Sequence, residues 1–114
     1  MGALAGVRYR AQDVRAYDRP VDVAFMLYPF LFEDDHRAWG LPRRYLRPAE
    51  LLAHVSGLVK PGGTLVIANQ GAAERERQHA LLAEAGLPVA WWGRHRTELY
   101  PFEPERYLTV VVKP

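Results

Sequence analysis

Two runs of apolar residues, with almost no alternating polar positions, dominate the hydrophobic pattern of this sequence. They are Val21–Leu27 and Thr64–Ala68. Near-continuous apolar runs of this length are typical of strands buried on both faces, as in parallel sheets. The first run ends at Tyr28, Pro29 and Phe30, because proline cannot continue a central ladder. The pattern therefore predicts two buried strands.

The segments after these runs have helical periodicity. Pro48 suits the first position of a helix, and apolar residues then recur at helical spacing up to Lys60, whose charge favours a helix C-terminus. Pro61–Gly63 predicts a turn, and residues 74–85 predict a second helix with Gly86 as its C-cap. The inward-facing positions are expected to be Leu51, Leu52, Val55, Leu58 and Val59 in the first helix, and Leu81, Leu82 and Ala85 in the second.

Two further strands are predicted near the C-terminus, at Val89–Trp92 and Tyr107–Val112. Arginine alternates with less polar side chains over residues 7–11, which indicates a short strand there. The alternation of strands and helices indicates an α/β sheet that ends in an antiparallel pair. We expect the 21–27 strand to lie parallel to the 64–68 strand, with the 107–112 strand beyond it and the 89–92 strand outermost. Trp91 and Trp92 should face opposite sides of the sheet, one of them buried.

Composition narrows the classes of protein to which this chain can belong. The chain has 114 residues, which fits a single domain spanning 1–114, and its net charge of +2 does not indicate a nucleic-acid protein. Arg94, His95 and Arg96 form only a small basic spot. The chain contains no cysteine, so disulfides and thiolate metal sites are excluded, and a cytoplasmic location is expected. No apolar run approaches the ~20 residues of a membrane helix.

An ordered set of motifs gives the sequence a family likeness. Asp22 opens the first apolar run, and Lys60-Pro61-Gly62-Gly63 stands between a helix and a buried strand. Ala85-Gly86-Leu87 ends the second helix, and a closing strand pair follows. In this order the motifs resemble the second half of class I S-adenosylmethionine-dependent methyltransferases. The resemblance implies a partial Rossmann-like sheet, mostly parallel with a C-terminal antiparallel pair and flanked by helices.

The resemblance also implies that the cofactor site is incomplete. The family holds S-adenosylmethionine at a Gly-rich loop after its first strand and at an acidic residue after its second. Only 20 residues precede Val21 here, so we expect a truncated methyltransferase-like domain without that loop. Asp13 is at the place where the family often contacts the adenine amino group. A turn or helix cap is the alternative role for Asp13.

Several residues are candidates for contact with the methyl acceptor. In the amino-methylating branch of the family an Asn or Asp precedes two prolines and an aromatic residue, but Leu27 and Tyr28 occupy the first two places here. Because leucine accepts no hydrogen bond, methylation of a nucleic-acid base is disfavoured. The residues expected at an acceptor site are Tyr28, Phe30 and Trp39 as aromatic walls, and Asn69 and Gln70 at the carboxyl end of the second strand. Core packing and loop capping are the respective alternatives.

The stretch Glu33–Arg37 is dense in titratable groups. Asp35 or His36 could remove a proton from a hydroxyl or amine acceptor, which makes them the candidate catalytic residues. A solvated loop is the alternative. We predict no metal site, because adjacent residues such as Asp34, Asp35 and His36 rarely converge on one ion.

Two functions from different classes remain open. The first is a methyltransferase acting on a small molecule or a protein, complete only with an N-terminal half. The second is a non-catalytic α/β domain that forms a homodimer through an exposed sheet edge at the Asp22 strand, because an unpaired apolar strand invites pairing. Nucleic acid and membrane are not expected partners.

Overall fold

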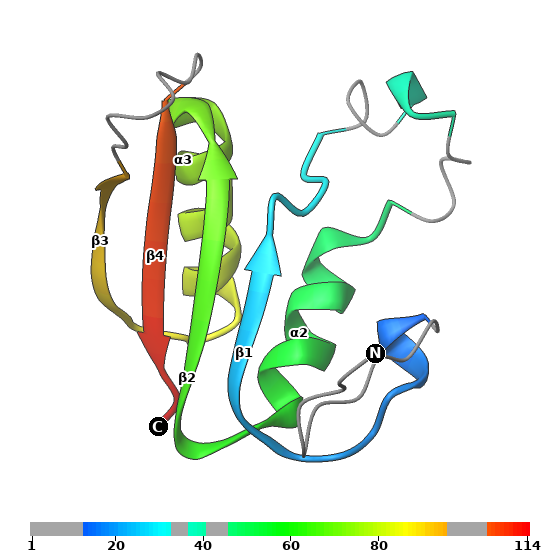
Figure 1. Ribbon diagram of the computed structural model, residues 1–114, viewed down its shortest axis with the longest axis vertical. Coiled ribbons are helices and arrows are strands. Elements are labelled where there is room, and N and C mark those ends of the chain that lie inside the picture. The colour runs from blue at the N-terminus through cyan, green and yellow to red at the C-terminus, as the bar shows by residue number, and fades with distance from the viewer. Residues whose placement is uncertain (1–12, 33–36, 41–45, 96–104) are drawn as a thin grey trace, which may run out of the picture.

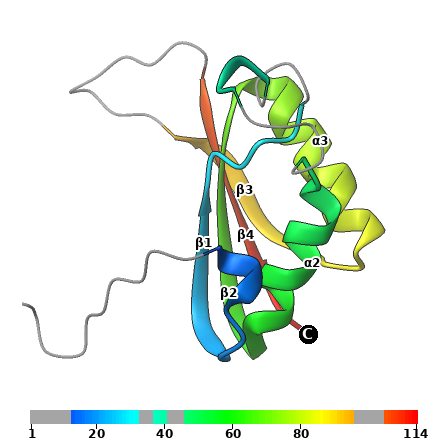
Figure 2. The same ribbon diagram turned by 90° about the vertical axis from the view of Figure 1, so that its right-hand side faces the viewer.

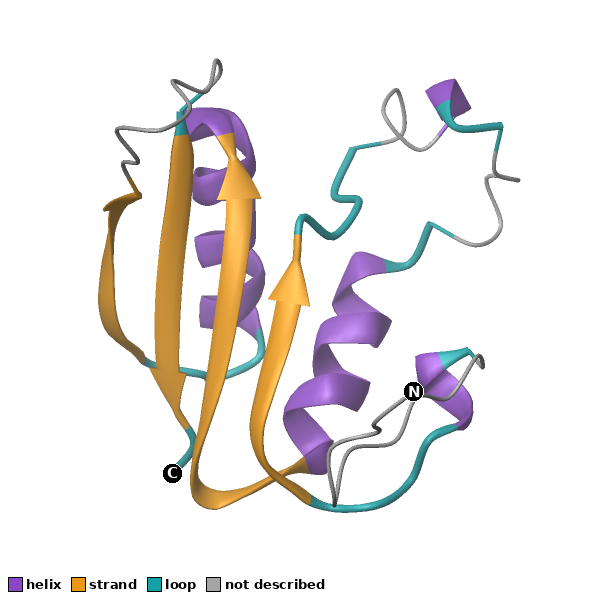
Figure 3. Cartoon of the chain, in the orientation of Figure 1, coloured by secondary structure: helices purple, strands orange, loops and turns teal. Residues whose placement is uncertain are grey.

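The computed structural model describes residues 13–32, 37–40, 46–95 and 105–114. The predicted strand at residues 7–11 lies outside these ranges. The described elements, drawn in Figures 1 and 3, are the 3-10 helix η1 (Val14–Ala16), β1 (Val21–Leu27), α2 (Pro48–Leu58), β2 (Val59–Gln70), α3 (Gly71–Glu84), β3 (Val89–His95) and β4 (Arg106–Val112).

The four strands form one sheet in the order β1-β2-β4-β3, which confirms the predicted order. β1 is parallel to β2, while β4 is antiparallel to both of its neighbours, β2 and β3. The expectation of a mostly parallel sheet is not confirmed, since β1 and β2 form the only parallel pair among the described strands. The reason is that β4 inserts between β2 and β3 and runs against both.

Both helices cover the same face of the sheet, as Figure 2 shows. The core lies between them and the strands, with Leu52 from α2, Leu82 from α3 and Ile67 from β2 each at most 1% exposed. Ala85, predicted to face inward, is exposed because α3 ends at Glu84. Among the described helices, none has the length and apolar character needed to cross a bilayer.

The opposite face of the sheet is bare over the described residues and strongly apolar. Val23, Phe25 and Leu27 of β1 are 49%, 66% and 67% exposed, because alternate residues of a strand point to the same side. Phe25 aligns in register with Val66 of β2, Val66 with Val110 of β4, and Val110 with Trp91 of β3. We call this side the open face.

Trp91 and Trp92 point to opposite sides of the sheet as predicted, but neither is buried. Trp91 is 55% exposed on the open face. Trp92 is 46% exposed on the helix side, where its ring lies 5.4 Å from that of His79 and the Arg75 guanidinium lies 4.2 Å above it. The prediction of one buried tryptophan is wrong because β3 is an edge strand, and α3 covers it only in part.

The turn Pro61–Gly63 is hydrogen-bonded to the C-terminal end of the chain and does not form a free loop. α2 ends at Leu58, so Lys60 belongs to β2, where it pairs with Asp22 at 3.2 Å instead of closing the helix. Gly62 N–H donates to the carbonyl of Lys113 at 2.8 Å. A Cβ on Gly63 would lie 2.6 Å from the Asp22 carbonyl oxygen, so only glycine fits there. The turn therefore fixes the end of the sheet where β1 begins.

Candidate active site

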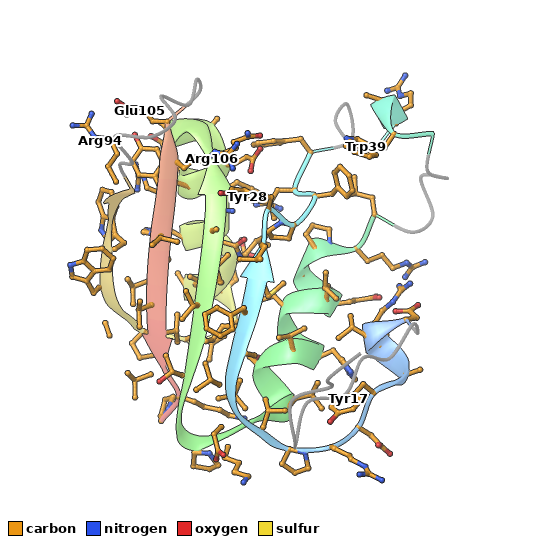
Figure 4. The ribbon with its side chains drawn as sticks, in the orientation of Figure 1. Tyr17, Tyr28, Trp39, Arg94, Glu105 and Arg106 are labelled. Carbon is orange, nitrogen blue, oxygen red and sulfur yellow. The ribbon has the colours of Figure 1, made fainter. Side chains whose placement is uncertain are left out.

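The carboxyl ends of β1 and β2 meet at one edge of the sheet, where α/β proteins place their ligands. A cavity of about 270 Å³ lies there. Its lining residues are Tyr28, Pro29, Phe30, Trp39, Gln70, Glu74 and Arg106. We call it the acceptor cavity, after the contact with a methyl acceptor that the sequence analysis expects of Tyr28, Phe30, Trp39 and Gln70. Figure 4 shows Tyr28 and Arg106 together at this edge, with Trp39 on the segment beyond β1.

Tyr28 turns the chain away from the sheet. Its N–H still donates to the carbonyl of Ala68 at 2.9 Å, but its φ of 53° is left-handed, which is rare for a residue other than glycine. Arg106, the first residue of β4, places its guanidinium carbon 4.8 Å above the Tyr28 ring. One wall of the cavity is thus built from the ends of two strands with β2 between them.

Phe30 and Trp39 form the aromatic corner of the cavity. Their ring centroids are 6.3 Å apart, with an angle of 64° between the planes, an edge-to-face contact. Trp39 is 77% exposed and Tyr28 is 39% exposed, so these two rings do not fill the core. The structure brings all three predicted aromatic residues to one cavity.

Asn69 and Gln70 face opposite sides of the sheet, although they are neighbours in sequence. Gln70 lines the acceptor cavity, and its backbone N–H donates to Glu74 Oε1 at 3.0 Å. Asn69 lies on the helix side, fully buried, and donates from Nδ2 to Gln78 Oε1 at 3.4 Å. Because successive strand residues face opposite sides, Asn69 is not brought to the cavity with the other candidates.

Asp13 caps η1 beside a second cavity of about 200 Å³. Its carboxylate accepts from Arg15 at N (3.0 Å), Nε (3.2 Å) and Nη2 (2.9 Å), and these side-chain and backbone hydrogen bonds lower the pKa of Asp13. His54 Nε2 lies 2.9 Å from the carbonyl oxygens of both Val14 and Tyr17, which holds η1 against α2. We call this second space the Asp13 cavity.

Phe30 is a wall of both cavities. A molecule in the Asp13 cavity and another in the acceptor cavity would therefore both contact Phe30. Asp35 and His36, the candidate catalytic residues, lie outside the described residues. In the described ranges no group of three His, Asp or Glu side chains is arranged to hold a metal ion.

Two charged cavity residues are not among the site residues that the sequence predicts. Glu74 is expected only as the first residue of the predicted helix 74–85, and Arg106 precedes the predicted strand 107–112. Their position follows from the pairing of Gln70 with Arg106 across β2 and β4, and from α3 beginning directly after β2. A register between strands that are distant in sequence is the signal that would have revealed them.

Comparison with solved structures finds the same fold in methyltransferases. Magnesium protoporphyrin IX methyltransferase of Synechocystis PCC 6803, bound to SAM, matches 90% of this chain at a TM-score of 0.55 and 14% identity. The putative DNA modification methylase TTHA0409 of Thermus thermophilus, complexed with S-adenosyl-L-methionine, matches 89% at 0.57 and 17%. A SAM-dependent methyltransferase of Leishmania major matches 90% at 0.57 and 11%.

These matches cover 44%, 52% and 43% of those three chains, so this chain spans about half their length. No protein-family profile and no curated protein matches the sequence. The chain has a partial SAM-dependent methyltransferase fold, as its motifs predicted.

Proposed function

We propose that this chain is the acceptor-binding half of an S-adenosylmethionine-dependent methyltransferase that acts on a small molecule or a protein. The observation that carries the proposal is the acceptor cavity, which lies where the two parallel strands end in a methyltransferase-like sheet. Methyl transfer is an in-line displacement that depends mainly on proximity and orientation, which a shaped cavity supplies.

The Asp13 cavity fits the adenine end of the cofactor. A carboxylate whose pKa is lowered stays ionised and accepts a hydrogen bond from an amino group. When bound, S-adenosylmethionine supplies an electrophilic methyl group on its sulfonium. The role of Asp13 is to fix the adenine ring in a cavity that shares Phe30 as a lining residue with the acceptor cavity.

The described residues fit only this one end of the cofactor. Gly62 and Gly63 cannot serve as its glycine-rich loop, because they sit where β1 begins, at the opposite end of the sheet. The remaining contacts belong in this proposal to the other half of the fold, carried by the same or another polypeptide. A proton acceptor for the reaction would come from Asp35 or His36, which lie between the cavity residues Phe30 and Trp39 along the chain.

The open face and the β1 edge support a missing half over a homodimer. Among the described residues no strand pairs with the outer edge of β1, which carries one charge, Asp22, and no proline, the usual protections of an edge strand. Two copies joined edge to edge would leave both open faces bare, and two copies joined face to face would leave both β1 edges unpaired. A segment with a strand and an apolar helix covers both surfaces at once.

The second candidate, a non-catalytic association domain, would use the same surfaces. The two functions differ at the Asp13 cavity, because an association domain has no reason to bind S-adenosyl compounds there. Chemical-shift mapping with S-adenosylhomocysteine tests this difference. We expect concentration-dependent shifts at Asp13, Phe30 and Leu51, which Asp13→Asn abolishes and the control Asp18→Asn leaves unchanged. Shifts confined to the open face, or none at the solubility limit, would contradict the methyltransferase proposal.

A further inference from the structure

We infer that His54 is a positioning residue of the Asp13 cavity, because it holds η1 against α2 and so fixes where the Asp13 carboxylate meets a ligand. The importance of His54 for the cofactor rests on the proposed function. The attachment of η1 rests on two hydrogen bonds and on the way the cavity is built between η1 and α2.

The Asp13 cavity lies between two segments that are far apart in sequence. Asp13 and Val14 line it from the side of η1, and Figure 2 shows η1 lying against α2. Pro48 and Leu51 line it from the beginning of α2. His54 follows Leu51 by three residues, so the two side chains are neighbours on the helix surface. The residue that ties η1 to α2 therefore lies directly beside the cavity wall.

His54 makes this tie through one ring nitrogen. Its Nε2 lies 2.9 Å from the carbonyl oxygen of Val14 and 2.9 Å from that of Tyr17. Carbonyl oxygens only accept, so Nε2 carries the hydrogen and donates to both of them. Tyr17 is the C-cap of η1, and carbonyl groups at a helix end need a donor from outside the helix. His54 supplies that donor.

The helix η1 depends on contacts of this kind. It is a single turn, Val14–Ala16, and one turn is not stable alone because helix nucleation is costly. None of its residues is buried, so apolar packing contributes little to its position. The hydrogen bonds from His54 therefore hold the turn, and with it Asp13 as its N-cap, in place.

The position of Asp13 matters because its carboxylate has little spare capacity. It accepts from Arg15 at N (3.0 Å), Nε (3.2 Å) and Nη2 (2.9 Å). A carboxylate has about four acceptor sites, so about one is left for a ligand. Hydrogen bonds weaken steeply when they are misaligned, and a donor must approach along this one direction. A displaced η1 would therefore lose the preference of Asp13 for a ligand with an amino group.

The test compares S-adenosylhomocysteine with its purine riboside analogue, which lacks only the adenine amino group, by NMR titration of the intact chain. We expect the unsubstituted chain to prefer the amino compound by about tenfold, as one hydrogen bond to a charged group provides. His54→Leu should lower this preference to about twofold or less. A general loss of stability weakens both compounds alike, so the preference separates positioning from stability.

His54→Gln should restore the preference, because its amide offers two N–H groups to the same two carbonyl oxygens. Ser56→Ala is the matched control. It removes the hydrogen bond from Ser56 Oγ to the Ala53 carbonyl oxygen at 3.1 Å on the same helix and should leave the preference unchanged. His54→Ala repeats the test if the leucine variant does not fold. A folded leucine or alanine variant that keeps the tenfold preference, or a glutamine variant that loses it, would overturn the inference.

Hydrogen exchange without ligand tests the attachment of η1 directly. The N–H groups of Ala16 and Tyr17 donate to the carbonyl oxygens of Asp13 and Val14 at 2.9 and 3.0 Å. Their exchange should be faster in His54→Leu than in the unsubstituted chain, and unchanged in the serine variant. Equal exchange in the leucine variant would refute the role of His54.

The two proposals fail in different ways. Cofactor shifts at Asp13 whose preference survives His54→Leu would reject the positioning role and keep the methyltransferase. An unsubstituted chain without S-adenosylhomocysteine shifts at Asp13 would reject the proposed function, and the role of His54 in cofactor binding with it.

Discussion

The guanidinium of Arg106 lies 4.8 Å above the ring of Tyr28, which joins the first residue of β4 to the residue that follows β1. This contact spans the end of β2 and closes one wall of the acceptor cavity. It also accompanies a strained backbone, because Tyr28 has a φ of 53°. The contact and the strain can be separated by substitution.

Tyr28→Gly should be more stable than Tyr28→Ala by about 1 kcal/mol. Both variants lose the stacking on Arg106, but only glycine adopts the left-handed conformation without the cost of ~1–2 kcal/mol that an L-residue bears there. Urea unfolding of the two variants measures the difference. An alanine variant of equal or greater stability would mean that the backbone at this position is not left-handed.

Gly63→Ala should destabilise the chain by about 1–3 kcal/mol. The new methyl would lie 2.6 Å from the Asp22 carbonyl oxygen and 2.8 Å from that of Lys60, and neither backbone group can yield easily. Gly57→Ala is the matched control, since nothing lies within 4 Å of its added Cβ in the exposed part of α2. The control should stabilise the protein by ~0.5–1 kcal/mol through helix propensity. Equal changes in stability for the two variants, measured by thermal unfolding, would contradict the close packing of Gly63 against the Asp22 and Lys60 carbonyl groups.

Stability should fall on acidification because of His79. Partial burial, followed by the nearby positive charge of Arg75, lowers the pKa of His79. The unfolded chain, with an ordinary histidine pKa of about 6.5, then binds the proton more readily than the folded chain. The stability from neutral His79 is therefore full above that value and is lost as the pH falls through the lower folded pKa.

The check is urea unfolding between pH 7.5 and 5 with and without His79→Gln. The substitution should flatten the pH dependence in this window, and glutamine can still bond to Thr109 Oγ1, which lies 2.9 Å from His79 Nε2. An unchanged slope, or a histidine that titrates above 6.5 by NMR, would show that the sign is wrong.

The open face should make the isolated chain self-associate. Phe25 is 66% exposed at the β1 end of an apolar row that crosses all four strands. Phe25→Glu should shift sedimentation toward the monomer without loss of stability, whereas Val14→Glu, a 41% exposed apolar position in η1 away from the sheet, should not. A clean monomer of the unsubstituted chain at high concentration would contradict this expectation.

The sequence predicted the strand order well, because apolar runs and helical periodicity are local patterns and the motifs came in a known order. It predicted the cavity less well. Asn69 and Gln70 look equivalent until the structure shows which face of β2 the helices cover. Arg106 reaches Tyr28 only through a strand register that links distant segments, and the exposure of Trp92 depends on how far α3 extends over the edge strand. These are tertiary facts that local patterns do not contain.

The affinity of the chain for S-adenosylmethionine tests the central claim most directly. In the proposed function the described residues supply Asp13 for the adenine end but no glycine-rich loop or ribose-binding carboxylate, and each unpaired polar anchor costs ~1–3 kcal/mol. Two lost anchors weaken a micromolar site by roughly two to four decades, since ~1.4 kcal/mol is tenfold. An NMR or calorimetric titration should therefore give a dissociation constant of roughly 0.1–10 mM, which Asp13→Ala weakens further. A micromolar dissociation constant, or one that Asp13→Ala leaves unchanged, would contradict the claim that this chain supplies only the Asp13 part of the cofactor site.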